Sequence, residues 1–225
     1  MISDLDGKIA IVTGAAGHLG RALTGRLRDV GATVVGLDAQ PPQAAGANGG
    51  AVVDLCDTDA VSGLINDVLG RYQRIDCLLN VTGGFSMAPA TDLGLWDTLW
   101  RKNLLTTLNV TRAMLPSMLA RNVGAIVNVA ARVEPARAQM AAYAASKSAV
   151  ICLTESLAAE VRASGVRVNC VMPSILDTPP NRQAMPDAET HQWVSPEALA
   201  DVMLFLCSDA ARAIHGAAIP VFGLS

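Results

Sequence analysis

Residues 9–20 read Ile9-Ala10-Ile11-Val12-Thr13-Gly14-Ala15-Ala16-Gly17-His18-Leu19-Gly20. The apolar run over 9–12 is typical of a buried strand, and a helical pattern follows from about His18 to Val30. Between them, Gly14, Gly17 and Gly20 allow the backbone to turn sharply and to approach an anion, which the positive end of the helix dipole favours. This strand–turn–helix context favours a pyrophosphate site over the alternative, a tight turn that binds nothing.

The rest of the chain continues this alternation of short apolar runs and longer helical patterns. Strands are expected over 33–37, 51–53, 75–79, 125–129, 166–171 and 218–221, and helices over 58–70, 95–119, 141–164 and 196–207. The runs are apolar throughout, which indicates parallel strands covered on both faces. With right-handed crossovers, we expect an α/β fold: a single doubly wound parallel sheet, Rossmann-like, of about seven strands, with helices on both faces. Long loops are expected over 39–50 and 173–195, where they can cap a site.

Composition limits the class of protein and its partners. A length of 225 residues fits one domain over 1–225, and 51% hydrophobic residues can form a full core. The net charge is −3 and Lys and Arg form no stripe, so neither nucleic acid nor an anionic membrane is expected as a partner. The sequence starts without a secretory pattern and has no apolar stretch that would span a bilayer, so a cytoplasmic location is expected.

The cysteines and histidines show no metal-binding spacing. Cys56, Cys77, Cys152, Cys170 and Cys207 are odd in number and lack a Cys-x-x-Cys pair, so reduced thiols are expected. The three histidines are scattered along the chain, so no metal site is expected.

Asp38 follows the second expected strand. An acid at this position accepts hydrogen bonds from the two ribose hydroxyls and repels a 2′-phosphate, so NAD(H) is favoured over NADP(H). The alternative is a strand-end Asp that caps a loop. Asp54, after the third strand, is expected either near the adenine or at a helix cap.

Tyr143 and Lys147 lie four residues apart in an expected helix, so they share one face. A free tyrosine has a pKa of about 10, which must fall by about 3 units, or roughly 4 kcal/mol, for proton exchange near neutrality. A neighbouring ammonium provides this kind of stabilisation for a phenolate. The Tyr-x-x-x-Lys spacing is common by chance, but here it follows the fifth strand of a nucleotide-binding pattern.

At this point the chain resembles the short-chain dehydrogenase/reductase family over nearly its whole length. The resemblance rests on residues 13–20, Asn80-Val81-Thr82-Gly83, Asn103, the Tyr143 and Lys147 pair, and Pro173-Ser174 with Thr178. It implies that Tyr143 is the general acid/base, that Lys147 lowers the Tyr143 pKa and holds the nicotinamide ribose, and that Asn103 fixes a water for proton relay. The alternatives are a helix-surface amide for Asn103 and a turn residue for Thr178.

The resemblance also implies the cofactor contacts and a homodimer or homotetramer. The long helices over 95–119 and 141–164 and the C-terminal strand are the expected interface. The expected cofactor contacts are Thr13, Gly14, Gly17, His18, Leu19, Gly20, Asp38, Asp54, Leu55, Asn80, Val81, Gly83, Tyr143, Lys147, Pro173, Ile175 and Thr178.

One position departs from the family pattern. The family places a serine after the fifth strand to hold the substrate carbonyl, but no Ser or Thr occurs from Val129 to Ala142. The loss of one such donor typically costs about 10²–10³ in rate. Quinonoid dihydropteridine reductases also lack this serine, and Gly83-Gly84-Phe85 and residues 177–186 with Trp193 resemble their loops. The expected substrate-side residues are Phe85, Ala131, Met185 and Trp193.

The sequence therefore predicts hydride transfer between a nicotinamide and a small carbonyl, alcohol, or quinonoid or imine substrate. A dihydropteridine-reductase-like enzyme is one alternative. A dinucleotide-binding sensor or scaffold without turnover is another, from a different class.

Overall fold

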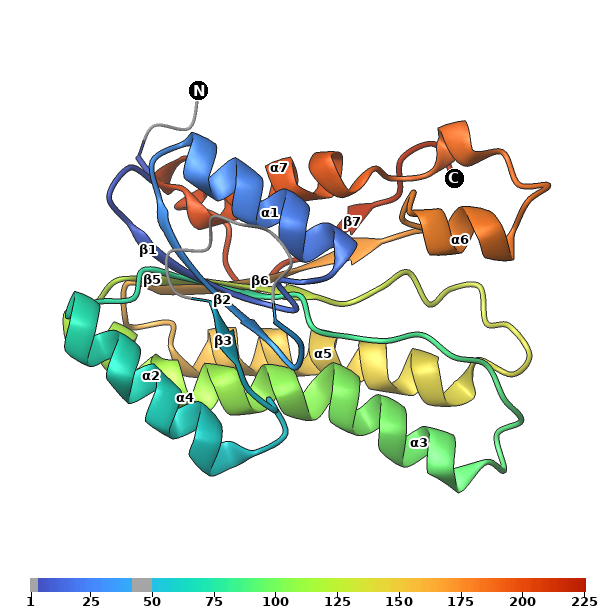
Figure 1. Ribbon diagram of the computed structural model, residues 1–225, viewed down its shortest axis with the longest axis horizontal. Coiled ribbons are helices and arrows are strands. Elements are labelled where there is room, and N and C mark those ends of the chain that lie inside the picture. Colours follow the sequence, from blue (N-terminus) through green and yellow to red (C-terminus); the bar gives the residue numbers. More distant parts are fainter. Residues whose placement is uncertain (1–3, 42–49) are drawn as a thin grey trace.

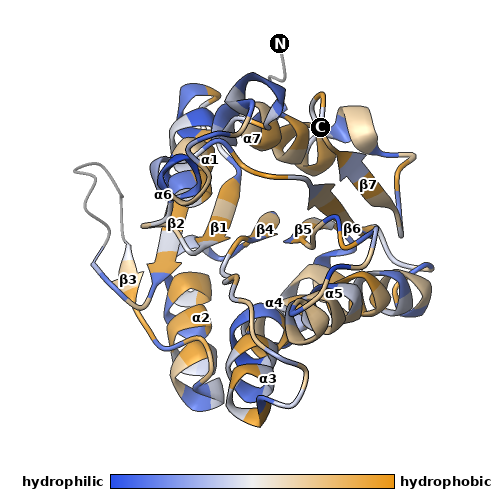
Figure 2. Ribbon diagram, turned by 90° about the vertical axis from the view of Figure 1, so that its right-hand side faces the viewer, coloured by the Kyte–Doolittle hydropathy of each residue, from blue (hydrophilic) through white to orange (hydrophobic). Residues whose placement is uncertain are grey.

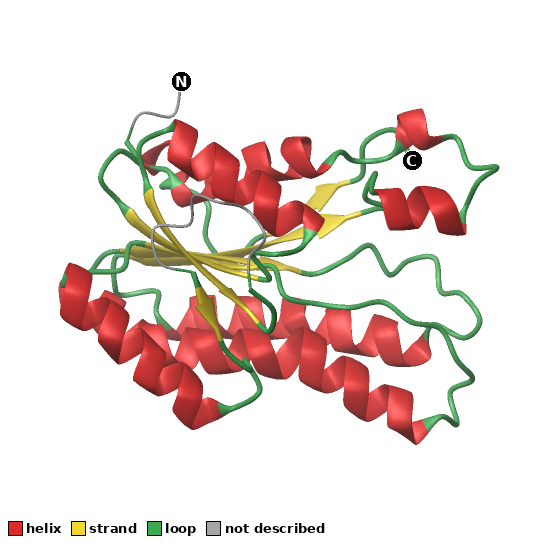
Figure 3. Cartoon of the chain, viewed as in Figure 1, coloured by secondary structure: helices red, strands yellow, loops and turns green. Residues whose placement is uncertain are grey.

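The computed structural model describes residues 4–41 and 50–225, in which a parallel sheet lies between two layers of helices (Figure 1, Figure 3). Within these residues seven strands pair in the order β3-β2-β1-β4-β5-β6-β7. They are β1 (Ile9–Thr13), β2 (Thr33–Asp38), β3 (Ala51–Val52), β4 (Cys77–Asn80), β5 (Gly124–Val129), β6 (Val166–Pro173) and β7 (Ala218–Val221). The predicted doubly wound α/β sheet is confirmed.

Helices cover both faces of this sheet (Figure 2). On one face lie α1 (His18–Asp29) and α7 (Pro196–Cys207), and on the other lie α2 (Thr58–Tyr72), α3 (Leu93–Trp100), α4 (Thr106–Arg121) and α5 (Ala141–Glu160). The helices direct apolar side chains to the sheet, which gives one buried core on each face. No helix in the described part of the chain is both long enough and apolar enough to cross a membrane.

The strand order reverses between β1 and β4, and one side chain joins the two loops that leave these strands. The hydroxyl of Thr13, at the end of β1, accepts hydrogen bonds from the Val81 N–H (3.0 Å) and the Thr82 N–H (3.1 Å), just after β4. Ligands of doubly wound sheets bind at this reversal, beyond the carboxyl ends of the strands. The fold therefore places a binding site where the two loops meet.

Some predicted boundaries are wrong, and tertiary contacts explain why. The helix predicted over 95–119 is divided by a π-helical turn, η1 (Arg101–Leu105), which inserts one residue without disturbing the apolar pattern on either side. The helix predicted over 141–164 ends at Glu160. The loop predicted over 173–195 contains a short helix, α6 (Pro179–Ala184), and residues 42–49 of the loop predicted over 39–50 lie outside the described residues.

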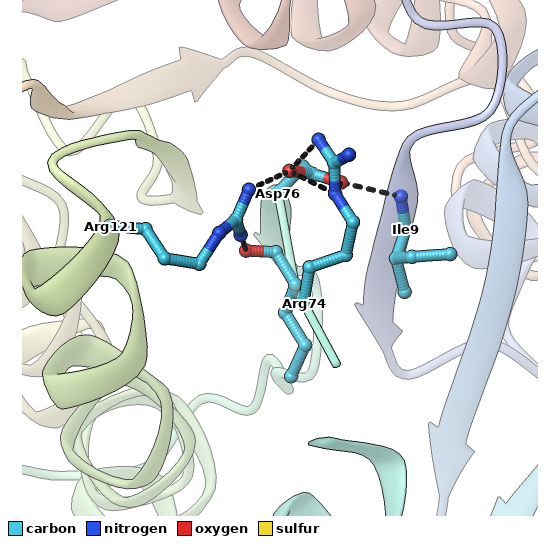
Figure 4. Close-up of polar contacts among 5 residues, drawn as sticks. Ile9, Arg74, Asp76 and Arg121 are labelled. Atoms are coloured by element: carbon cyan, nitrogen blue, oxygen red, sulfur yellow. Dashed lines mark hydrogen bonds and ion pairs between the residues drawn. The ribbon is translucent and has the colours of Figure 1, made fainter. Parts of the chain in front are cut away.

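Asp76, immediately before β4, is the centre of a polar cluster at the amino end of the sheet (Figure 4). Its side chain is 4% exposed and accepts hydrogen bonds from Arg74 (2.7 Å), Arg121 (3.1 Å) and the Ile9 N–H (2.9 Å). Burial by itself raises the pKa of Asp76, but the hydrogen bonds from Arg74, Ile9 and Arg121 outweigh it, so this pKa lies below its ordinary value. The carboxylate therefore links β1, the start of β4 and the end of α4.

We expect Asp76→Asn to lower the free energy of unfolding by about 2–3 kcal/mol, because two guanidinium groups lose their counter-charge. The folded-state pKa is depressed, so the wild-type advantage is present above the unfolded pKa of about 4 and is lost as the pH falls through the folded pKa. Urea unfolding of both proteins at about pH 7 and about pH 3 measures this difference. A difference in unfolding free energy between the two proteins that is the same at both pH values would contradict the assignment.

Candidate active site

A cleft of about 850 Å³ lies at the carboxyl ends of β1, β2 and β4. The strands are parallel, so residues distant in the sequence meet at this edge. The expected cofactor residues that line it are Gly14, Gly17, His18, Leu19, Gly20, Asp38, Asp54, Leu55, Val81, Gly83 and Thr178.

The turn between β1 and α1 leaves the start of the helix open to an anion. The N-cap residue Gly17 provides no side-chain acceptor for the first-turn N–H groups, and the first turn holds no acidic residue. A Cβ added to Gly20 would overlap the Gly14 carbonyl oxygen, so only glycine lets the helix lie this close to the turn. Unpaired N–H groups at a positive dipole end form a phosphate site, and the residues present therefore fit the pyrophosphate of a dinucleotide.

The Asp38 carboxylate is fixed on the wall of the cleft next to this turn. One oxygen accepts from the Ala16 N–H (2.9 Å) and the other from the Gln40 N–H (3.1 Å). Each carboxylate oxygen keeps a second acceptor site. Asp38 thus caps its own loop, as the alternative interpretation required, and it can still accept hydrogen bonds from ligand hydroxyls.

α5 carries Tyr143 and Lys147 to the end of β5. The Lys147 side chain is 5% exposed, and its Nζ donates a hydrogen bond to the Val129 carbonyl oxygen (2.8 Å). Gly83 lies against it, because an added Cβ there would be 3.1 Å from Lys147 Nζ and 3.0 Å from Asn103 Oδ1. The loop after β4, the end of β5 and one face of α5 therefore meet at a buried ammonium.

Burial shifts the pKa of both residues of the pair. It raises the pKa of Tyr143 to about 12 and lowers that of Lys147 to about 8. For Tyr143 this is opposite to the direction predicted from the sequence. The reason is that Lys147 is itself desolvated and directs a hydrogen bond to Val129, so its charge does not offset the burial of the phenol. Tyr143 therefore holds its proton at neutral pH.

Asn103 lies in the π-helical turn η1, and its side chain is fully buried. Its Oδ1 accepts from the Gly84 N–H (2.7 Å), and its Nδ2 donates to the Gly84 carbonyl oxygen (3.1 Å) and to Ser146 Oγ (2.9 Å). Ser146 Oγ in turn donates to the Tyr143 carbonyl oxygen (2.8 Å). The alternative of a helix-surface amide is wrong, because Asn103 joins the loop after β4 to the first turns of α5.

The side chain of Asn80, a predicted cofactor contact, points from the sheet toward α4 and α5. It is buried, and its Nδ2 donates to Thr111 Oγ1 (3.1 Å) and Asn128 Oδ1 (2.9 Å). Asn128 continues the chain of hydrogen bonds to Thr154 Oγ1 (2.9 Å). These side chains connect β4 and β5 with α4 and α5, so Asn80 supports the loop after β4 from beneath.

Four other predicted cofactor contacts are not simply part of the cleft lining. Thr13 and Pro173 are buried, and Ile175 is half-buried away from the cleft lining. Thr178 does line the cleft, and its hydroxyl also accepts from the Asn181 N–H (3.5 Å) as the cap of α6. The turn-residue alternative for Thr178 therefore describes part of what this side chain does.

On the substrate side, the structure brings Phe85 to Tyr143. Their ring centroids are 4.9 Å apart in an edge-to-face arrangement, and Phe85 remains 60% exposed. Ala131 is buried after β5, at the end of which the expected serine is missing. Met185 and Trp193 are half-buried in the segment around α6, and neither lines the cleft.

One wall of the cleft was not predicted from the sequence. This wall is formed by Asp97, Thr98, Arg101, Lys102 and Thr106, which recur at helical spacing before and after Asn103. The spacing was visible in the sequence, but only the packing of the helix across the sheet edge shows that this face borders the cleft. In the described residues no group of three or more His, Cys, Asp or Glu side chains is placed to hold a metal ion.

Comparison with known proteins agrees with this geometry. Residues 8–189 match the family model for short chain dehydrogenases. The chain is 34% identical to D-threitol dehydrogenase of Mycolicibacterium smegmatis, over 97% of this chain and 93% of that protein. An NAD⁺-bound xylitol dehydrogenase superposes with a TM-score of 0.88 at 25% identity, covering 97% of this chain and 99% of that one. A Beutenbergia cavernae protein assigned as an NAD(P)-dependent gluconate 5-dehydrogenase, with NADP bound, gives 0.88 at 31% identity, covering 99% and 98%.

The buried ammonium predicts a specific pH dependence of stability. The folded pKa of Lys147 is about 8 and its ordinary value is 10.5, so the unfolded chain binds more protons between these values and the cost of burying the charge is lost as the pH rises. Relative to Lys147→Met, the free energy of unfolding of the wild type should rise by up to about 3 kcal/mol between about pH 7 and pH 10.5, because each pKa unit corresponds to about 1.36 kcal/mol.

Urea unfolding of both proteins across this range measures the gain. Lys102→Met, at an exposed lysine, is the matched control and should show no such trend. If the difference in unfolding free energy between the wild type and Lys147→Met does not change with pH, the wild-type ammonium is not desolvated.

Proposed function

We propose that Tyr143 exchanges the proton and that Lys147 holds the cofactor ribose. The chain belongs to the short-chain dehydrogenase/reductase family and is therefore an NAD(P)-dependent oxidoreductase. A nicotinamide supplies or accepts the hydride when it is bound. The observation that carries the proposal is the buried Lys147 ammonium, one helical turn from Tyr143 and in contact with the cleft residue Gly83.

In the reductive direction Tyr143 acts as the general acid. Its raised pKa keeps the phenol protonated at neutral pH, so a proton is available when the substrate gains negative charge. Lys147 is protonated below its pKa of about 8, so its ammonium can donate hydrogen bonds to the cofactor ribose. Asn103 is a positioning residue, since it holds Gly84 and, through Ser146, the start of α5. The water relay that the family resemblance implies remains a prediction.

The substrate class proposed is a small carbonyl, alcohol, or quinonoid or imine compound. Ala130 and Ala131 are both buried after β5, and no hydroxyl group takes the place of the family serine there. The exposed ring of Phe85 beside Tyr143 offers a surface for a flat ring. These two observations favour a dihydropteridine-reductase-like activity as the second candidate, because a conjugated ring that accepts hydride needs a proton donor but less of a carbonyl clamp.

For the cofactor, we propose a preference for NAD(H) over NADP(H). The support is the Asp38 carboxylate on the cleft wall, which would repel a 2′-phosphate. The similar proteins include one with bound NAD⁺ and one with bound NADP, so the preference depends on this residue rather than on the family.

For assembly, we propose a homodimer or homotetramer formed by one domain over 1–225. Leu93, Trp100 and Leu108 expose large apolar surface along α3 and α4, at the predicted interface. Sedimentation velocity would test this, and a monomer at micromolar concentration would contradict it.

A cytoplasmic location remains a prediction from the sequence.

The proton-transfer assignment predicts that Tyr143→Phe loses about 10²–10⁴ in kcat while its NADH affinity stays within about threefold of wild type. The assay is NADH oxidation with a panel of quinonoid pterins, quinones, diketones and sugar-derived ketones. Turnover of the pterins or quinones alone would select the second candidate. Near-normal turnover by Tyr143→Phe would refute the role of the phenol, and wild-type binding of NADH without turnover of any compound would instead support the sensor or scaffold alternative.

The cofactor assignment predicts that the wild type binds NADH at least about tenfold more tightly than NADPH. Asp38→Asn should weaken NADH binding by about 1–2 kcal/mol, through the loss of charged acceptors for the ribose hydroxyls, and should bring the two affinities closer. Fluorescence titration measures both constants, and Asp54→Asn is the control, with a smaller effect on the ratio. A wild type that prefers NADPH would overturn the assignment.

A further inference from the structure

A second, small cavity, of about 60 Å³, lies at the amino ends of the strands, the edge opposite to the cleft. Two thiols face it from different elements: Cys77 begins β4, and Cys207 ends α7. They are 130 residues apart in the chain (207 − 77). The proposed oxidoreductase function uses neither residue.

Both thiols are largely buried, and each residue keeps a small exposed fraction. Cys77 is 2% exposed and Cys207 5% exposed, and both belong to the core between the sheet and the α1–α7 layer. Hydrogen bonding between them is the largest cause that raises the pKa of Cys77 well above its ordinary value, and burial adds to it. Both side chains line the same cavity and belong to the same buried cluster, so the two thiols lie close to each other.

Positive charge lies beside Cys207. Arg167 donates hydrogen bonds to the Leu206 carbonyl oxygen (2.7 Å) and the Ser208 carbonyl oxygen (3.0 Å), on either side of Cys207, which offsets the negative end of the α7 dipole. Lys8 also lines the cavity. The carboxylates that line it are Asp4, Asp76 and Asp209, and Asp76 is paired with Arg74 and Arg121.

We propose that Cys77 and Cys207 form an oxidative modification site, at which hydrogen peroxide closes a reversible disulfide bond between β4 and α7. Peroxide is close to water in size, and both cysteines line the cavity. The proposal is independent of the function assigned to the cleft.

The chemistry proceeds in two balanced steps. The Cys207 thiolate attacks one peroxide oxygen, so an S–O bond forms, the O–O bond breaks and the departing hydroxide takes up a proton as water. The Cys77 sulfur then attacks the sulfur of this sulfenic acid: an S–S bond forms, the S–O bond breaks, and the Cys77 proton leaves with the oxygen as a second water. The two thiols lose two electrons, which reduce one peroxide to two waters.

The test is peptide mapping of the full-length protein after treatment with hydrogen peroxide, with alkylation of the remaining thiols in denaturant. We expect one cross-linked peptide pair that joins Cys77 to Cys207, the loss of these two thiols, and their full recovery after dithiothreitol. Cys152→Ser, which removes an exposed thiol on α5, should form the same cross-link. Oxidation in urea should give mixed pairs instead.

Two variants test the order of the steps. Cys77→Ala should trap Cys207 as a sulfenic acid that dimedone labels, whereas Cys207→Ala should leave Cys77 unlabelled. If Cys77 and Cys207 are both still alkylated in denaturant after Cys152 has been oxidised, the proposal is wrong. Separate sulfinic acids at both positions, without a cross-link, would overturn it as well.

Discussion

The Thr13 hydroxyl joins the two loops on which the cleft depends. A doubly wound sheet sends the chain in opposite directions after β1 and after β4, so nothing in the helices holds these loops together. Thr13 does so by accepting the Val81 and Thr82 N–H groups. Gly83, the next residue, then meets the Lys147 ammonium and the Asn103 amide. The turn after β1 and the Tyr143–Lys147 pair are thereby connected through the loop after β4.

The buried lysine and tyrosine at the centre of the site, taken alone, disfavour folding. A lysine with a pKa near 8 and a tyrosine with a pKa near 12 are both kept in surroundings that oppose their charged forms. The surrounding structure offsets this cost elsewhere. The Asp76 cluster fixes the opposite edge of β4, and the amide chain through Asn80 and Asn128 ties β4 and β5 to the helices below. The pair is therefore positioned by a sheet that is stabilised away from it.

The family to which the chain belongs explains the scaffold, and the departures from its pattern indicate where this protein differs. The segment after β5 holds buried alanines instead of a hydroxyl donor, and the Phe85 ring packs edge-to-face on Tyr143. Tyr143, the proposed proton donor, thus has an apolar neighbour in Phe85. Fold alone does not assign the substrate, and the chemistry of these positions is what narrows it.

The sequence by itself determined the element order, the parallel sheet, the phosphate turn and the family, because strand and helix periodicity and the glycines of residues 14–20 are local signals. It also placed Tyr143 and Lys147 on one helix face. Only the tertiary structure decided that the Asn80 side chain points toward α4, that Asn103 sits in a π-helical turn, and that burial raises the pKa of Tyr143. It alone brought Cys77 and Cys207 to one cavity. Desolvation and contacts between distant segments depend on how whole layers pack, and no local pattern encodes them.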